Sequence, residues 1–254
     1  MTAPKTFTAS LIAALAMPIA ASAVEVSKDL EFSGSVESTG ADPGGFGESN
    51  FYGSGNDDGL GSYGIATFQF SAAEFGAPVL SIDGLTLSLS HDNRGFTDGD
   101  EFELFLTTDD FADDLYAGLA YDDSGASDPN GIDPSDFGTL LSLGVFPYTP
   151  SAADAGSAAP GQPVEGDTES FVITLDLSDE AALVAEINAN SQFSILIGAT
   201  DIADDVTFTG QNNFFSGGIV PNLTINATAI PEPTSLLIFG VATGVLALRR
   251  RRSA

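Results

Sequence analysis

The sequence contains no cysteine and no tryptophan, and it has a single histidine among 254 residues. Without cysteine there are no disulfides, no cysteine nucleophile and no thiolate metal site. One histidine excludes a multi-histidine metal centre and argues against a catalytic triad built on histidine. Positive charge is also scarce, because 7 Lys and Arg stand against 36 Asp and Glu, a formal net charge of −29. A surface this negative repels phosphate backbones, so nucleic acid is not an expected partner.

The acidic composition does not indicate a disordered chain. Hydrophobic residues make up 43% of the sequence and the mean hydropathy is +0.15, whereas disordered acidic segments are poor in core-forming residues. The length is sufficient for one large domain or two small ones. We therefore expect a folded body with a negatively charged surface.

The N-terminal residues have the three parts of a secretory signal. Lys5 precedes an apolar segment at residues 7–16, which is too short to cross a bilayer. Ala21 and Ala23 supply the small-x-small pattern that signal peptidase accepts. The sequence therefore predicts that residues 1–23 direct export and are removed by cleavage before Val24.

The C-terminal residues combine a proline-rich tripeptide, an apolar segment and a basic end. Pro231, Glu232 and Pro233 precede 14 uncharged residues at 235–248. Because about 20 residues usually span a bilayer, a helix here would cross with local thinning of the membrane and snorkelling of the basic side chains. The chain ends in four consecutive arginines that the positive-inside rule places in the cytoplasm, namely Arg249, Arg250, Arg251 and Arg252.

This tail, residues 231–254, resembles the PEP-CTERM sorting signal in the order of its motif, apolar helix and arginine cluster. The resemblance covers under a tenth of the chain. It implies processing by an exosortase, a membrane-embedded cysteine peptidase-transferase. It further implies a Gram-negative bacterium that makes extracellular polysaccharide, with delivery to the envelope, the outer surface or the matrix. The alternative is an ordinary single-pass membrane anchor.

The remaining body, residues 24–230, shows repeated alternation of apolar and polar residues, the pattern of half-buried strands. The alternating segments are residues 66–70, 85–90, 102–106, 171–178, 193–197, 206–208 and 223–225. Glycine-, asparagine- and aspartate-rich stretches separate them and predict turns. This pattern favours a single all-β domain, an antiparallel β-sandwich and most plausibly a jelly roll.

Three departures from this pattern carry further expectations. The apolar residues after Ser178 recur at helical spacing and predict one short helix near 179–189, with Ser178 as its N-cap. We expect this helix to cover one end of the sandwich. The proline-rich residues 147–168 are expected to form a long loop within the single domain. The glycine-rich residues 40–64 are likewise expected to be mainly loop.

The acidic loops are the candidates for a metal site. They gather carboxylate and amide oxygens, which are the ligands that calcium prefers. The candidate ligands of a structural Ca²⁺ are Asp92, Asn93, Asp98, Asp100, Asp128, Asn130 and Asp133. The alternative is that these residues bond their own backbone in solvated turns. His91 is expected to lie in such a turn without a catalytic partner.

No motif in the body indicates catalysis, so we expect a non-enzymatic surface or matrix protein that associates with the envelope or with exopolysaccharide. A carbohydrate-binding module is one alternative, since jelly rolls often bind sugars. It would require an exposed tyrosine or phenylalanine platform. A secreted glycan hydrolase is a second alternative, because two suitably placed carboxylates suffice for that chemistry.

Overall fold

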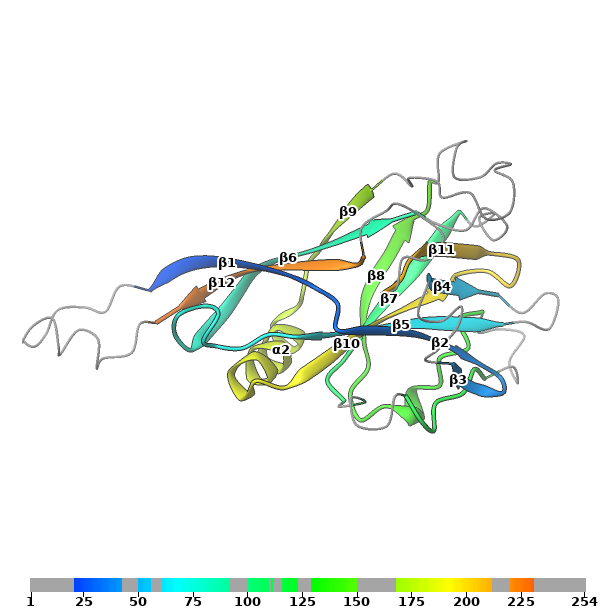
Figure 1. The fold of residues 1–254 in the computed structure, drawn as a ribbon, viewed down its shortest axis with the longest axis horizontal. Helices are drawn as coiled ribbons and strands as arrows, with labels where there is room; N and C mark the ends of the chain where they lie inside the picture. The colour runs from blue at the N-terminus through cyan, green and yellow to red at the C-terminus, as the bar shows by residue number, and fades with distance from the viewer. Residues whose placement is uncertain are drawn as a thin grey trace, which may run out of the picture.

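A computed structural model describes residues 21–42, 50–55, 61–91, 100–109, 111, 116–122, 129–149, 168–211 and 220–230. Within these residues the chain forms β-strands, one α-helix and one short 3₁₀ helix (Figure 1). The first strands are β1 (Ser22–Asp29), β2 (Phe32–Glu37), β3 (Gly40–Asp42), β4 (Asn50–Ser54), β5 (Ser62–Gln69), β6 (Val79–Ser90) and β7 (Glu101–Thr107). The later elements are η1 (Pro134–Asp136), β8 (Leu141–Pro147), β9 (Thr168–Ile173), α2 (Leu177–Ala189), β10 (Gln192–Ala199), β11 (Asp205–Thr209) and β12 (Asn222–Ala229).

The strands of the described residues form two antiparallel sheets. Sheet A has the order β1-β12-β6-β9, and sheet B has the order β11-β4-β5-β10-β7-β8, with β2 and β3 attached beside β5. In Figure 1 β1 and β12 of sheet A project to the left, β2, β4 and β5 of sheet B lie on the right, and α2 lies at the end toward which β1 and β12 project. An isolated bridge between His91, at the end of β6, and Phe208 of β11 links the two sheets along one side. The expectation of an all-β, sandwich-like protein is confirmed.

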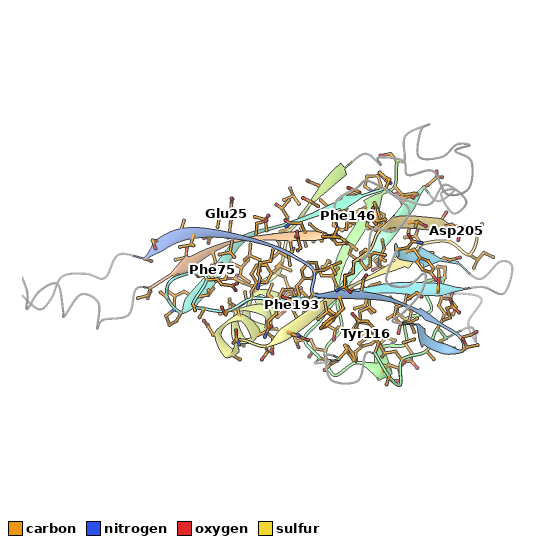
Figure 2. All side chains as sticks on the ribbon, in the orientation of Figure 1. Glu25, Phe75, Tyr116, Phe146, Phe193 and Asp205 are labelled. Atoms are coloured by element: carbon orange, nitrogen blue, oxygen red, sulfur yellow. The ribbon has the colours of Figure 1, made fainter. Side chains whose placement is uncertain are left out.

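The main core lies between the sheets. It contains the inward-facing residues of β6, β12 and β9 on one side and those of β5, β10 and β7 on the other. Phe193 is fully buried there and stacks against Phe68 and Phe70, with ring centroids 6.2 and 6.0 Å apart. Figure 2 shows Phe193 in the interior, whereas Glu25 of β1 points away from the body.

Sheet B is also covered on its second face. Tyr63 and Ile65 of β5 and Leu196 of β10 are fully buried on that side, in a second cluster. Their cover comes from the connection between β7 and β8, which contributes Tyr116, Leu119, Tyr121, Ile132 and Phe137. The expectation of strands buried on one side only is therefore wrong for β5 and β10, because this connection forms a third layer. It also explains Phe105, an apolar residue at an expected polar position, which packs against the same cluster.

Helix α2 lies close to the predicted range 179–189 but begins earlier, at Leu177. Its N-cap is Asp176, whose side chain accepts hydrogen bonds from the backbone N–H groups of Ser178 and Asp179. The predicted cap, Ser178, is wrong because a carboxylate two residues earlier already accepts those donors. The fully buried Leu183 and Ile187 belong to the main core, so the helix packs into one end of the sandwich as expected.

The glycine-rich residues 40–64 contain more strand than predicted. They include β3, β4 and the start of β5. Gly64 of β5 lies very close to the backbone of β4. A Cβ at this position would lie only 2.7 Å from the carbonyl oxygen of Tyr52, so a residue with a side chain would not fit. The same residue type that indicates a loop therefore permits two backbones to approach closely here. Of the predicted loop 147–168, residues 150–167 lie outside the described residues.

Candidate functional site

The structure describes three of the seven predicted calcium ligands. Asp100 precedes β7, and its backbone carbonyl accepts a hydrogen bond from Tyr148 N at 2.7 Å. The side chain of Asn130 accepts from Ile132 N at 3.0 Å, and that of Asp133 accepts from Ser135 N at 2.8 Å. Both side chains thus stabilise local turns, as the alternative interpretation expects. The other candidates, Asp92, Asn93, Asp98 and Asp128, lie outside the described residues.

Three described acids nonetheless lie close together, since Asp133 and Asp136 lie near the buried Tyr63 and Asp122 lies near Asp136. Asp133 caps the 3₁₀ helix η1, which ends at Asp136, and Asp122 N donates to Gly131 O at 2.8 Å in the neighbouring turn. Desolvation raises the pKa of Asp136, and the negative charges of Asp133 and Asp122 raise it further. Burial raises the pKa of Tyr63 well above its usual value, and Asp136 and Asp133 add to the effect. The Tyr63 hydroxyl is fully buried and has no hydrogen-bond partner among the described residues.

These acids do not form a metal centre within the described part of the chain. No group of three or more histidine, cysteine, aspartate or glutamate side chains there is placed to hold a metal ion. Calcium prefers six to eight oxygen ligands, more than this turn supplies from described side chains. The calcium site therefore stays a prediction.

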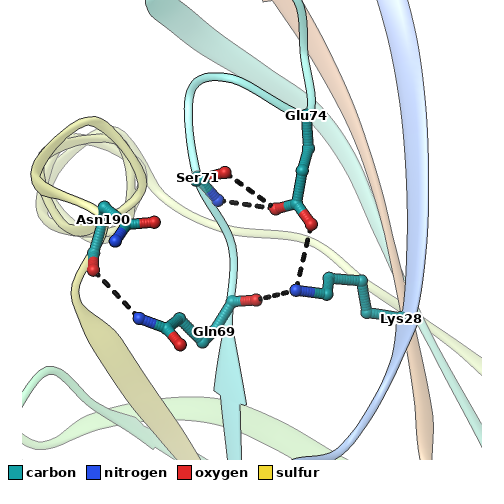
Figure 3. A network of polar contacts seen from close by, with 5 residues as sticks. All are labelled: Lys28, Gln69, Ser71, Glu74 and Asn190. Carbon is teal, nitrogen blue, oxygen red and sulfur yellow. Dashed lines mark hydrogen bonds and ion pairs between the residues drawn. The ribbon is translucent and has the colours of Figure 1, made fainter.

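Lys28 is the only lysine or arginine within the described ranges, and it joins the two sheets at one end of the molecule (Figure 3). Its Nζ donates to the backbone carbonyl of Gln69 at 2.7 Å and pairs with Glu74 Oε1 at 3.0 Å. The second oxygen of Glu74 accepts from Ser71 N at 2.8 Å. Partial desolvation opposes ionisation of Glu74, but the hydrogen bonds from Lys28 and Ser71 outweigh it and hold its pKa below the usual value. This contact ties strand β1 to the segment that follows β5.

His91 does not lie in an exposed turn as expected. It is fully buried at the end of β6, with its ring centroid 5.0 Å from that of Tyr148 and 5.1 Å from that of Phe208. Its backbone forms the bridge to β11. The sequence around His91 is polar, so the burial of this side chain follows from the tertiary packing of β6 against β11.

The two ends of the folded body lie side by side. Strand β1 pairs antiparallel with β12 from Ser22 opposite Ala229 to Asp29 opposite Asn222. Figure 1 shows these two strands projecting together from one end of the molecule. The predicted cleavage before Val24 would leave six pairs of this ladder, because Val24 lies opposite Ala227.

Hydrogen bonds fix this end to the rest of the body. Ile230 N donates to Pro78 O at 3.2 Å. The Asn188 side chain of α2 bonds both backbone groups of Val79, accepting from the N–H at 2.9 Å and donating to the carbonyl at 2.8 Å. Asn188 marks the end of α2 in the sequence, but its role in holding the start of β6 could not be deduced from spacing alone.

No helix in the described residues is long and apolar enough to cross a membrane. Three predicted features lie outside the described residues. They are residues 1–20 of the predicted signal, the sorting motif at Pro231, Glu232 and Pro233, and the arginines at 249–252. Ala21 and Ala23, the predicted recognition residues for signal peptidase, are exposed, and Ala23 already belongs to β1.

The fold and these contacts define the class of the molecule as an all-β, sandwich-like protein with antiparallel sheets. No known protein family matches the chain, and no curated protein matches it significantly.

Proposed function

We propose that this chain is an exported, non-enzymatic protein of the cell surface or extracellular matrix, sorted by an exosortase and associated with exopolysaccharide. The observation that supports it best is the pairing of β1 with β12, which brings Ser22 opposite Ala229. The predicted export signal ends at residue 23 and the predicted sorting tail begins at residue 231. Both segments are therefore joined to the same end of the body, and an anchor at either terminus would turn that end toward the membrane.

The short connection to the tail fits this orientation. Strand β12 ends at Ala229, which is buried, and Ile230 is tied to Pro78. The predicted motif begins at the next residue, Pro231. Because prolines do not continue a strand ladder, Pro231 and Pro233 favour an extended, accessible segment directly after the folded body.

The strand order supports the more specific assignment of a jelly roll. In sheet A the first and last strands are neighbours, in the order β1-β12-β6-β9. In sheet B, β5, β10, β7 and β8 follow one another. A jelly roll interleaves its strands between two four-stranded sheets in this manner, so we assign β2, β3, β4 and β11 as additions to that framework.

Mass spectrometry of the protein from the cells that produce it tests the function, with the exosortase gene intact or deleted. The expected mature chain begins at Val24 and ends near Pro231, and deletion of the exosortase leaves residues 231–254 in place. A released protein that retains Arg249–Arg252 in exosortase-positive cells would overturn the proposal.

A matched pair of variants separates the motif from general effects on export. Replacing Pro231, Glu232 and Pro233 by alanine should leave an uncleaved, membrane-bound chain. Replacing Ser38 and Thr39, exposed in the turn between β2 and β3, by alanine should leave processing unchanged. Equal processing of both variants would show that the tripeptide is not the recognised signal.

A further inference from the structure

The outer face of sheet A is a regular array of short polar side chains. On β12 these are Asn222, Thr224, Asn226 and Thr228, alternating with the buried residues Leu223, Ile225, Ala227 and Ala229. The register brings Asn222 beside Ser88 of β6, and Thr224 beside Thr86. In an antiparallel sheet, side chains on adjacent strands at such positions share one face.

Hydrogen bonds hold the side chains of this face in fixed positions. Along β1 and β12, Thr224 Oγ1 donates to Ser27 Oγ at 3.0 Å, and Ser27 Oγ donates to Asn222 Oδ1 at 2.7 Å. Toward the other edge of the same face, between β6 and β9, the hydroxyls of Ser88 and Ser170 lie 2.9 Å apart. Because these groups are already ordered, a ligand that binds them loses little additional side-chain entropy.

The face is open and its centre carries no charge. Val172, opposite Thr86, is 72% exposed, and a Cβ added to Gly84 would meet nothing nearer than 3.8 Å. The acids Glu25 and Asp29 lie on the edge strand β1, and Asp83 lies beside Thr228, to which it is hydrogen-bonded at 2.7 Å. No lysine, arginine or aromatic residue occupies an outward-facing position in these four strands of the described chain. Lys28 of β1 lies at an inward-facing position, opposite the buried Leu223, and contacts Glu74 and Gln69.

We propose that the outer face of sheet A binds an uncharged, extended polysaccharide. The face lacks the aromatic platform expected of a carbohydrate-binding module, so the binding depends on hydrogen bonds instead of ring stacking. Hydroxyl and amide groups both donate and accept hydrogen bonds, as sugar hydroxyls do. Val172 offers an apolar contact for the C–H groups of a sugar ring. The mature body has only Lys28 and Arg94 against 35 acidic residues, a formal charge of −33, so it repels an anionic polymer. An extended polymer can lie across several strands of this face, which are spaced about 4.8 Å apart.

This inference rests on the proposed function and names the partner of the exported body. The ends of the described body, Ser22 and Ala229, lie opposite each other at one end of sheet A, so a body held at that end presents the outer face of this sheet sideways, clear of the membrane. The polymer then contacts the face without competing with the anchor.

Affinity electrophoresis of the protein purified from its producing cells tests the inference. The gels contain hydroxyethylcellulose as the neutral polymer or alginate as the anionic one. We expect retardation by hydroxyethylcellulose that is unchanged between low and high NaCl, and none by alginate, because charge does not contribute to the binding. Absence of retardation by the neutral polymer, or stronger retardation by alginate, would overturn the inference.

Two variants of equal charge locate the binding surface. Thr86→Lys with Asn226→Lys places long cationic side chains at the centre of the face, and should weaken retardation by at least about tenfold in apparent Kd, the equivalent of one or two lost hydrogen bonds. The control, Ser38→Lys with Thr39→Lys, adds the same charge to an exposed turn and should bind like the unmodified protein. Equal retardation of the two variants would place binding elsewhere and refute the assignment.

Further measurements test whether the variants are folded, whether the face binds a second copy, and whether the chain is processed. Thermal unfolding of both variants checks that the fold is retained, and Ser170→Lys, exposed on the edge strand β9, replaces the double variant if that one does not fold. A dimer in size-exclusion chromatography that is lost in the face variant, with no retardation by polysaccharide, would show that the face binds a second copy instead. Mass spectra of the same samples report processing independently, so a failure of sorting and a failure of binding are distinguished.

Discussion

The outer faces of the two sheets differ in how they are covered. On β12, sheet A presents alternating threonine and asparagine to solvent and apolar residues to the core. Sheet B is buried on both faces at β5 and β10, so that Leu196 and Ile195, neighbours on β10, are each fully buried on opposite sides. A strand that alternates in polarity, such as β12, is therefore covered on one face only. A strand that is apolar on both faces, such as β10, indicates a third layer above the sheet.

The largest expected effect comes from truncating the second cluster. Leu196→Ala removes a side chain packed beneath the connection between β7 and β8, and should lower the free energy of unfolding by about 3 kcal/mol. Val172→Ala on the outer face of sheet A should change it by less than about 0.5 kcal/mol, because that side chain is 72% exposed. Urea denaturation of both variants measures the contrast, and similar losses would show that the two faces are equally covered.

A smaller effect follows from removing one hydroxyl on each face. Thr67 is fully buried on sheet B, where its hydroxyl lies 2.8 Å from Ser194 Oγ and 3.0 Å from the Tyr116 hydroxyl. Thr67→Val should cost about 1–2 kcal/mol because both partners lose a bond in a buried site. The matched Thr86→Val, on the outer face of sheet A, should cost less than about 0.5 kcal/mol. Thermal unfolding compares the pair, and an equal shift in Tm would contradict the difference in burial.

The same hydroxyl pair has a spectroscopic signature. Burial raises the pKa of Tyr116 to about 12, although the hydrogen bond with Thr67 opposes the shift. The tyrosine absorbance at alkaline pH should therefore include a component that titrates above the ordinary tyrosine range. This component should decrease in Tyr116→Phe, while the contribution of Tyr63, whose pKa burial also raises, remains. A titration curve identical to that of the unmodified protein would contradict this assignment.

Lys28→Met should lower the free energy of unfolding by about 1 kcal/mol or less, because the ion pair with Glu74 is partly exposed to solvent. The pKa of Glu74 is lower in the folded protein than its reference value of 4.5. The stabilisation is therefore complete above pH 4.5 and is lost as the pH falls through the folded pKa. Unfolding measured across this range should show the two proteins converging at acidic pH, and a constant difference would exclude the ion pair as its source.

The smallest effect is expected at the edge of the layer that covers sheet B. The pKa of Asp136 is raised by desolvation and by its acidic neighbours. The ionised carboxylate therefore destabilises the folded protein. The free energy of unfolding should increase as the pH falls through the folded pKa of this group toward its reference pKa of 3.8. Asp136→Asn should raise the free energy of unfolding at pH 7 by less than about 0.5 kcal/mol. A loss of stability at pH 7 would show that the carboxylate has a favourable partner.

Local patterns were sufficient for β6, β9 and β12 of sheet A and for the helix, whereas β1 was not among the predicted strands. Alternation at Leu85, Leu87 and Leu89 and at Leu223 and Ile225 predicted β6 and β12, since one face of each strand meets the core and the other meets water. The acidic first turn and the spacing of Leu183 and Ile187 predicted α2. The polar alternation of residues 222–228 was equally visible, but its meaning as one row of a larger array depended on the neighbours of β12.

Other features could not be predicted because they depend on contacts between distant segments. The burial of His91 depends on β11, more than 100 residues later in the chain. The strand β4 within a glycine-rich segment depends on the glycine of β5 that lets it approach. The turn roles of Asn130 and Asp133 depend on local backbone geometry that composition does not specify.

Composition and local spacing are enough to predict the all-β class, the scarcity of cations in the body and the two terminal segments expected to direct export and sorting. The meeting of both ends of the body, the third layer on sheet B and the shared polar face of four strands became visible only in the folded molecule. These properties arise from the pairing of strands far apart in the chain, and pairing is set by the packing of the whole core rather than by any single segment.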